Sequence, residues 1–178
     1  MRLFFGLSLP DRIRAAAAQF AGEAQRLIPG RYTLKENYHI TLAFLGDVPP
    51  ERLGEAQTVL AESIRRFPAP RITLLAPGHF GRAQNGILIL GAASDPPLEP
   101  LHETLVNALS ARNLPADPGP FTPHITLARH ADVTMGFPPP PAPLSFTAEK
   151  AHVFLSARNA QGVLVYTPIA SAAFAENG

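Results

Sequence analysis

A short pattern that contains histidine and threonine occurs twice in this chain, as His39–Leu42 (HITL) and His124–Leu127 (HITL). Both copies lie in apolar surroundings typical of strands, YHITLAFL and FTPHITLAR. Because residues i and i+2 of a strand share one face, each copy directs one imidazole and one hydroxyl to the same side. Two such strands brought together predict a cleft that holds two histidines and two threonines.

This set of side chains suits acid–base chemistry on a phosphate. To open a cyclic phosphodiester between neighbouring ribose oxygens, a base must take a proton from water and an acid must protonate the leaving oxygen. Histidine suits both tasks because its ordinary pKa of about 6.5 leaves both forms available near neutral pH. The hydroxyls of Thr41 and Thr126 can donate hydrogen bonds to the non-bridging oxygens. The scheme requires no metal and no cofactor.

Arg129 is a candidate phosphate ligand beside the second motif. It lies five positions beyond His124, and odd spacing puts it on the opposite face of a regular strand. We therefore expect Arg129 to reach the phosphate only if the strand ends or bends there.

The elements around the motifs follow the order strand, helix, strand twice. A strand over Leu3–Leu9 precedes a helix from Pro10-Asp11, with the apolar stripe Ile13, Ala17, Phe20, Ala24 and Leu27, and then the strand of His39. A strand over Ile87–Leu90 precedes a helix carrying Leu98, Leu101, Leu105 and Leu109, and then the strand of His124. Strand start and histidine are 36 positions apart in the first copy (39 minus 3) and 37 in the second (124 minus 87).

Other segments complete the predicted order. A further helix begins at Pro49–Glu51, and the glycines 78, 81 and 86 predict a loop between strands Ile72–Leu75 and Ile87–Leu90. Phe137–Pro143 (FPPPPAP) predicts an extended connector. Two last strands, about Ser145–Leu155 and Val163–Ile169, turn over Asn159–Gly162. We predict an α+β fold, one domain over residues 1–178, in which two lobes with antiparallel sheets and flanking helices are related by a pseudo-twofold axis across a central cleft.

Composition limits the classes of function. The formal net charge of +1 favours contact with a few phosphates over binding to long stretches of nucleic acid backbone. The chain contains no cysteine, which excludes thiol nucleophiles, disulfides and zinc–thiolate sites. No segment approaches the roughly 18 consecutive apolar residues of a membrane helix. We expect a cytoplasmic protein with no membrane association, a monomer without an obligate protein partner.

The paired motifs, the string FTPHITLAR and the N-terminal strand RLFFGL resemble the 2H phosphoesterase superfamily, and within it the RNA 2′,3′-cyclic phosphodiesterases, also called 2′-5′ RNA ligases. The resemblance covers nearly the whole chain. It implies a substrate, RNA ends that bear a 2′,3′-cyclic phosphate, and a 2′-phosphomonoester product, with reversible 2′-5′ RNA ligation as a further activity of some members. It also implies that His39 is the proton donor to the leaving 3′-oxygen, that His124 is the proton acceptor from water, and that Thr41, Thr126 and Arg129 hold the phosphate.

Some positions depart from the family pattern, and these departures bear on substrate preference. Arg31-Tyr32 stands where relatives often carry Arg-Trp, and residues 80–85 (FGRAQN) stand where they often carry an Arg-Pro-Arg-like stretch. In the same segment, Phe80 is the candidate for stacking on a base, whereas we expect Phe44 and Phe121 in the core. Two alternatives stay open: hydrolysis of small cyclic nucleotides or an ADP-ribose cyclic phosphate, and a module that binds RNA ends without catalysis.

Overall fold

The structure is a computed structural model and describes residues 1–175. Its strands form one nine-stranded sheet in which every pairing is antiparallel. The helices are α1 (Asp11–Ala24), α2 (Leu53–Ile64) and α3 (Glu99–Ala111), with 3₁₀ turns η1 (Lys35–Asn37) and η2 (Pro50–Arg52). The strands are β1 (Arg2–Ser8), β2 (Arg31–Tyr32), β3 (His39–Asp47), β4 (Arg71–Arg82), β5 (Asn85–Asp95), β6 (His124–Ala131), β7 (Ser145–Thr147), β8 (Lys150–Arg158) and β9 (Leu164–Ala173).

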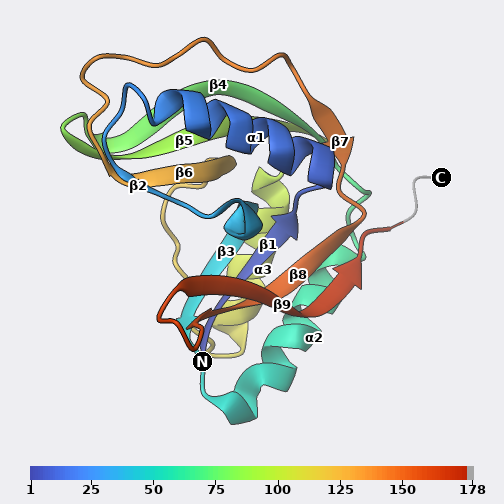
Figure 1. Cartoon of the computed structure of the whole chain (residues 1–178). Coiled ribbons are helices and arrows are strands. Elements are labelled where there is room, and N and C mark those ends of the chain that lie inside the picture. Colours follow the sequence, from blue (N-terminus) through green and yellow to red (C-terminus); the bar gives the residue numbers. More distant parts are fainter. Residues whose placement is uncertain (176–178) are drawn as a thin grey trace.

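The sheet consists of two halves, which confirms the predicted α+β fold. The strand order is β7-β4-β5-β6-β3-β1-β8-β9, and the halves meet where β6 pairs with β3 through Ile125 and Ile40. Figure 1 shows the β4–β5–β6 half with α1 lying across it, and the β1–β3–β8–β9 half below. α3 contacts β3, while α2 contacts α3, β8 and β9, so these two helices cover the second half. The pair of motif strands therefore lies at the centre of the sheet.

Helix α1 confirms the predicted apolar stripe except at its end. Ile13, Ala17 and Phe20 are buried at the expected spacing, and Ala24 closes the helix. Leu27 was predicted on the same stripe but is 56% exposed. The helix ends at Ala24, so Leu27 lies in the following turn, where helical spacing no longer directs it to the buried side.

The predicted glycine-rich loop is wrong, because this segment forms a hairpin. β4 and β5 pair without interruption from Pro77 and Leu90 to Arg82 and Asn85, and the chain reverses over residues 83–84. Gly81 has φ +79°, and a Cβ atom at Gly86 would lie 2.8 Å from the carbonyl oxygen of Phe80. These glycines therefore permit a close backbone approach in a tight turn. As a result Phe80 lies in a strand.

The C-terminal part also differs in one respect. The predicted strand Ser145–Leu155 is divided into β7, which pairs with β4, and β8, which pairs with β1. The division lets the chain pass from one half of the sheet to the other. The turn over Asn159–Gly162 is confirmed, and the predicted connector Phe137–Pro143 has no helix or strand and passes over the α1 side of the molecule (Figure 1). Within residues 1–175, no helix is long and apolar enough to cross a membrane.

We expect Gly86→Ala to lower the free energy of unfolding by about 1–3 kcal/mol, because the added methyl group would be forced against two carbonyl oxygens. Gly22→Ala, in α1, is the matched control: a Cβ there meets nothing within 4 Å, and we expect a gain of about 0.5–1 kcal/mol. Urea unfolding of the three proteins tests this. Equal stability of Gly86→Ala and wild type would contradict the tight turn.

Candidate active site

The two HITL motifs lie on adjacent central strands that run in opposite directions. Ile40 faces Ile125 in the ladder, so the register brings His39 towards Thr126 and Thr41 towards His124. Both isoleucines are fully buried, which leaves the histidines and threonines on the other face. All four side chains line one cleft of about 550 Å³. The structure therefore brings together the quartet that the sequence predicted.

Both imidazoles are held in the same way. The Nδ1 atom of His39 lies 2.7 Å from the carbonyl oxygen of Asn37, and that of His124 lies 2.7 Å from the carbonyl oxygen of Thr122. A carbonyl can only accept, so each Nδ1 carries the proton and each Nε2 of a neutral ring is an acceptor. The Nε2 of His39 is 3.1 Å from the hydroxyl of Thr41. The two rings therefore have a fixed tautomer in which Nε2 is the acceptor nitrogen, and in His39 this nitrogen accepts from the Thr41 hydroxyl.

A β-bulge lies at the last residue of each motif, and the bulge in the second motif decides where Arg129 lies. Along β6, Thr126 pairs with Ile89 and Ala128 with Leu88, so Leu127 is an extra residue in the ladder. The bulge shifts the alternation, and Arg129 lines the cleft together with His124. This is the bend that the odd spacing of Arg129 required.

The first motif has the same bulge at Leu42, because Thr41 pairs with Gly6 and Ala43 with Phe5. Phe44 consequently lines the cleft and is half-buried, which corrects its predicted core position. His102, from α3, contacts the carbonyl oxygen of Leu42 through Nδ1 at 2.7 Å and stacks on the half-buried Phe121. His102 therefore holds the bulge from the side opposite the cleft.

Aromatic rings enclose His39 more completely than His124. Phe4 lies 4.6 Å from the His39 ring, Tyr166 lies 5.1 Å from it edge-on, and Phe154 lies at 5.8 Å. His124 is met edge-on by Phe80 at 4.9 Å. Phe80 thus packs against a site histidine from β4, and it is not among the cleft-lining side chains. Its role in stacking on a base stays a prediction.

Asn37 is a site residue that the sequence reasoning missed. It is buried, its amide nitrogen donates to the carbonyl oxygen of Leu164 at 2.8 Å, and its side-chain oxygen accepts from the Tyr166 N–H at 3.0 Å. The side chain of Asn37 therefore fixes this residue to β9, while its backbone carbonyl orients His39. The partners are more than 120 positions away, so no local pattern marks this residue.

Burial makes both histidines hard to protonate in the free protein. Loss of solvent, together with the smaller effect of positive charge on His124 and Arg129, lowers the pKa of His39 to about 4, although the hydrogen bond to the Asn37 carbonyl raises it. The pKa of His124 is also lowered, first by burial and then by Arg129. Both rings are therefore mainly neutral at pH 7 in the free protein.

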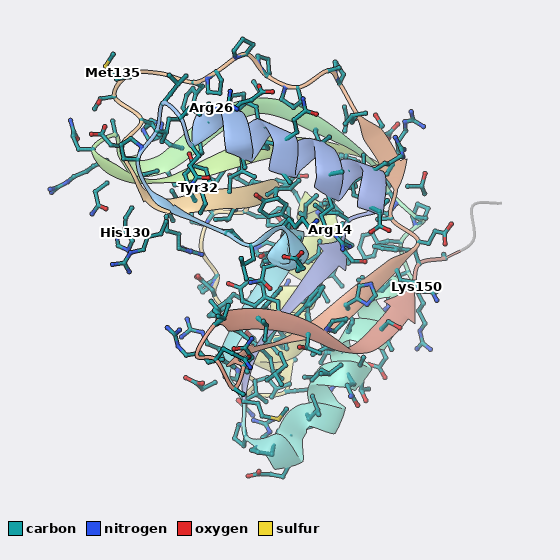
Figure 2. The ribbon with its side chains drawn as sticks, in the orientation of Figure 1. Arg14, Arg26, Tyr32, His130, Met135 and Lys150 are labelled. Carbon is teal, nitrogen blue, oxygen red and sulfur yellow. The ribbon has the colours of Figure 1, made fainter. Side chains whose placement is uncertain are left out.

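The remaining histidines do not join this site. His79 is exposed on β4 near Phe137, His130 contacts Asn85, and His152 contacts the hydroxyl of Ser8. Figure 2 labels His130 and Lys150, near His152 on β8, at opposite edges of the molecule, so these histidines are not clustered. Among residues 1–175, no group of three or more histidine, aspartate or glutamate side chains is arranged to hold a metal ion.

The fold and the site together define the class: a two-halved α+β protein whose paired His-x-Thr motifs meet in a central cleft. Residues 9–157 match the model of the 2′-5′ RNA ligase superfamily, and the chain belongs to that superfamily. This agrees with the resemblance found in the motifs.

Individual relatives agree with the family. The chain is 34% identical over 174 residues to an RNA 2′,3′-cyclic phosphodiesterase of Escherichia coli, covering 94% of this chain and 93% of the relative. A relative of the same name from Geobacillus stearothermophilus is 33% identical over 128 residues; the match spans 71% of this chain but only 41% of that relative. The crystal structure of E. coli LigT with NADP+ superposes with a TM-score of 0.81 at 31% identity, covering 98% and 97% of the two chains.

Acid should lower the free energy of unfolding because the buried His39 ring resists protonation in the folded protein. Its pKa is about 4 in the folded protein and about 6.5 in the unfolded chain, so the unfolded state binds the proton first as pH falls. The free energy of unfolding should therefore fall by about 3 kcal/mol between pH 7 and pH 4 because of this group, and the effect should be complete below pH 4.

Denaturant unfolding of wild type and His39→Gln at several pH values isolates this effect, since other titrating groups are common to both proteins. We expect the variant to lose less stability in acid. An identical pH dependence in the two proteins would contradict the burial of the His39 ring.

Proposed function

We propose that this protein opens 2′,3′-cyclic phosphate ends of RNA to 2′-phosphomonoesters, with His39 and His124 as the proton carriers. The observation that carries the proposal is the matched pair of imidazoles that line one cleft, each with Nδ1 hydrogen-bonded to a backbone carbonyl so that Nε2 is the acceptor nitrogen. The names of the curated relatives, RNA 2′,3′-cyclic phosphodiesterases, support the same substrate class.

The reaction distributes the roles between the two halves of the sheet. His124 takes a proton from water as the water oxygen bonds to phosphorus, and His39 gives a proton to O3′ as the bond between phosphorus and O3′ breaks. Thr41, Thr126 and Arg129 stabilise the charge that grows on the non-bridging oxygens. With a ribose 5′-hydroxyl group in place of water, the same proton transfers would join a 2′-5′ linkage as the bond to O3′ breaks, and their reversal would cleave that linkage.

The charge state of His39 depends on the substrate in this mechanism. A donor must start protonated, but the free protein holds the pKa of His39 at about 4. The negative charge of a bound phosphodiester opposes the positive charge of Arg129 and favours the imidazolium form. Substrate binding would therefore charge the acid in the cleft where it is used.

A second candidate is hydrolysis of a small cyclic nucleotide. It is favoured by the size of the cleft, about 550 Å³, which is within the range of about 300–1,000 Å³ for small-molecule sites. Crystal structures of the similar E. coli LigT are described as complexes with NADP+, ATP and 3′-AMP. Comparing a nucleoside 2′,3′-cyclic phosphate with an RNA oligomer of the same end separates the two candidates.

We expect His39→Ala and His124→Ala each to reduce turnover of an RNA oligomer with a 2′,3′-cyclic phosphate by about 10²–10⁴-fold, the contribution of one positioned acid or base. The assay uses EDTA-treated protein and determines the position of the product phosphate. His79→Ala, an exposed histidine away from the cleft, is the control and should keep wild-type turnover. Near-normal activity of either cleft variant would exclude the two-histidine mechanism. Tight binding without turnover by wild type would favour the binding module.

The pH dependence should be bell-shaped, since one ring must be charged and the other neutral. kcat/KM reports the free protein, in which both pKa values are lowered, whereas kcat reports the complex with the anion. We therefore expect the kcat/KM profile to lie on the acid side of the kcat profile. Coincident profiles would argue that the bound phosphate does not charge the donor.

A further inference from the structure

The two copies of the motif differ at one informative position. The first reads HITLAF and the second HITLAR, so Phe44 stands where Arg129 stands in the other half. Both residues follow a bulge and both line the cleft. The half with Phe44 nevertheless has a cation at this place, because the guanidinium carbon of Arg2 lies 5.1 Å from the centre of the Phe44 ring. Arg2 therefore supplies from β1 the charge that the first motif lacks.

The cleft carries positive side chains along the half of the sheet that contains β1 and β8, as well as beside the histidines. Arg2 and Arg158 line it together with Arg129, and no aspartate or glutamate is among its described lining residues. The ion pairs found within residues 1–175 use other arginines, Arg14, Arg52 and Arg112. The guanidinium of Arg158 donates to the carbonyl oxygen of Gly162 at 2.6 Å, which holds this charge at the β8–β9 turn. Within the described residues, none of these lining arginines forms an ion pair with an acidic side chain, so their charges suit an anion.

Arg2 lies beyond Phe4 as seen from His39. The Phe4 ring is 4.6 Å from the His39 ring, and Arg2 is two residues from Phe4 along β1, where both line the cleft. Two steps along a strand measure about 7 Å. Stacked nucleotides rise about 3.4 Å each, so the spacing of Phe4 and Arg2 suits the next nucleotides of a strand whose cyclic end lies at His39.

The chemistry of ring opening decides which part of the RNA lies here. Water attacks phosphorus from the side opposite O3′, so O3′ and its ribose lie on the side of the proton donor His39. The upstream nucleotides are joined to that ribose and continue into the same half of the sheet. Arg2, Phe4 and Arg158 belong to β1 and β8 of that half. Phe80, against His124, lies instead on the side of the attacking nucleophile.

We propose that Arg2 and Arg158 bind phosphates of the nucleotides that precede the cyclic end, so that this site selects oligonucleotides over mononucleotides. The inference rests on the proposed function and defines its substrate further. Arg129 acts on the reacting phosphate, whereas Arg2 and Arg158 act on internal phosphates of the same strand.

The first test compares kcat/KM for a nucleoside 2′,3′-cyclic phosphate, a dinucleotide and a tetranucleotide with the same end. For wild type we expect a gain of about 10-fold or more with length, the effect of one added charge-assisted phosphate contact. In Arg2→Gln and Arg158→Gln the ratio of tetranucleotide to mononucleotide should fall towards one, and Arg2→Lys should restore part of it. Arg26→Gln is the control, since Figure 2 labels Arg26 at α1 in the other half of the molecule.

A binding measurement separates failure of this inference from failure of the proposed function. Anisotropy of a labelled tetranucleotide with a 2′-phosphate end gives the slope of log Kd against log salt, which should fall by about 0.7 for each phosphate contact removed. Turnover that does not depend on oligonucleotide length would overturn the inference and leave the reaction standing. The same holds if wild type and the double variant Arg2→Gln/Arg158→Gln have equal tetranucleotide-to-mononucleotide ratios of kcat/KM and equal salt slopes. A lower slope in the double variant but no turnover by wild type would support the subsite and refute the reaction.

Discussion

The pairing of β3 with β6 at Ile40 and Ile125 is the constraint on which the site depends. Both isoleucines are fully buried, and their pairing joins the two halves of the sheet. Because side chains alternate across a strand, burial of this pair forces the flanking histidines and threonines to the other face. A shift of either strand by one residue would move the imidazoles into the core. The hydrophobic core thus fixes the register, and the register fixes the chemistry.

The bulges at Leu42 and Leu127 bring one further side chain of each strand, beyond the histidine and threonine of the motif, to the cleft. Without them, strict alternation would place Phe44 and Arg129 on the core face, where an unpaired guanidinium is costly. With them, each strand presents a third side chain to the cleft. His102 contacts the carbonyl oxygen at the first bulge and supports it from α3. A local irregularity of the sheet is therefore what brings a cation to the two imidazoles.

The sequence predicted the elements and the quartet because both depend on local spacing. The helices, the central strands and the repeat of His-x-Thr have periodicities that can be read over a few turns or residues. The hairpin of β4 and β5 was missed because glycines 81 and 86 permit a tight turn as readily as a loop, and cross-strand pairing decides between them. Asn37 was missed because its partners on β9 come from a distant part of the chain.

Two identical motifs need not give two identical histidines. Both rings are oriented by a carbonyl two residues earlier, yet three aromatic rings surround His39 and one ring meets His124. The heavier desolvation is the largest cause that lowers the pKa of His39 to about 4, so in the free protein this ring is mostly uncharged, whereas the proposed donor role requires the charged form. The enclosure that disfavours the imidazolium also strengthens its attraction to a bound anion, since fewer water molecules screen the pair. A phosphodiester therefore has most effect on the more enclosed ring, and unequal burial can turn a symmetric pair into one acid and one base.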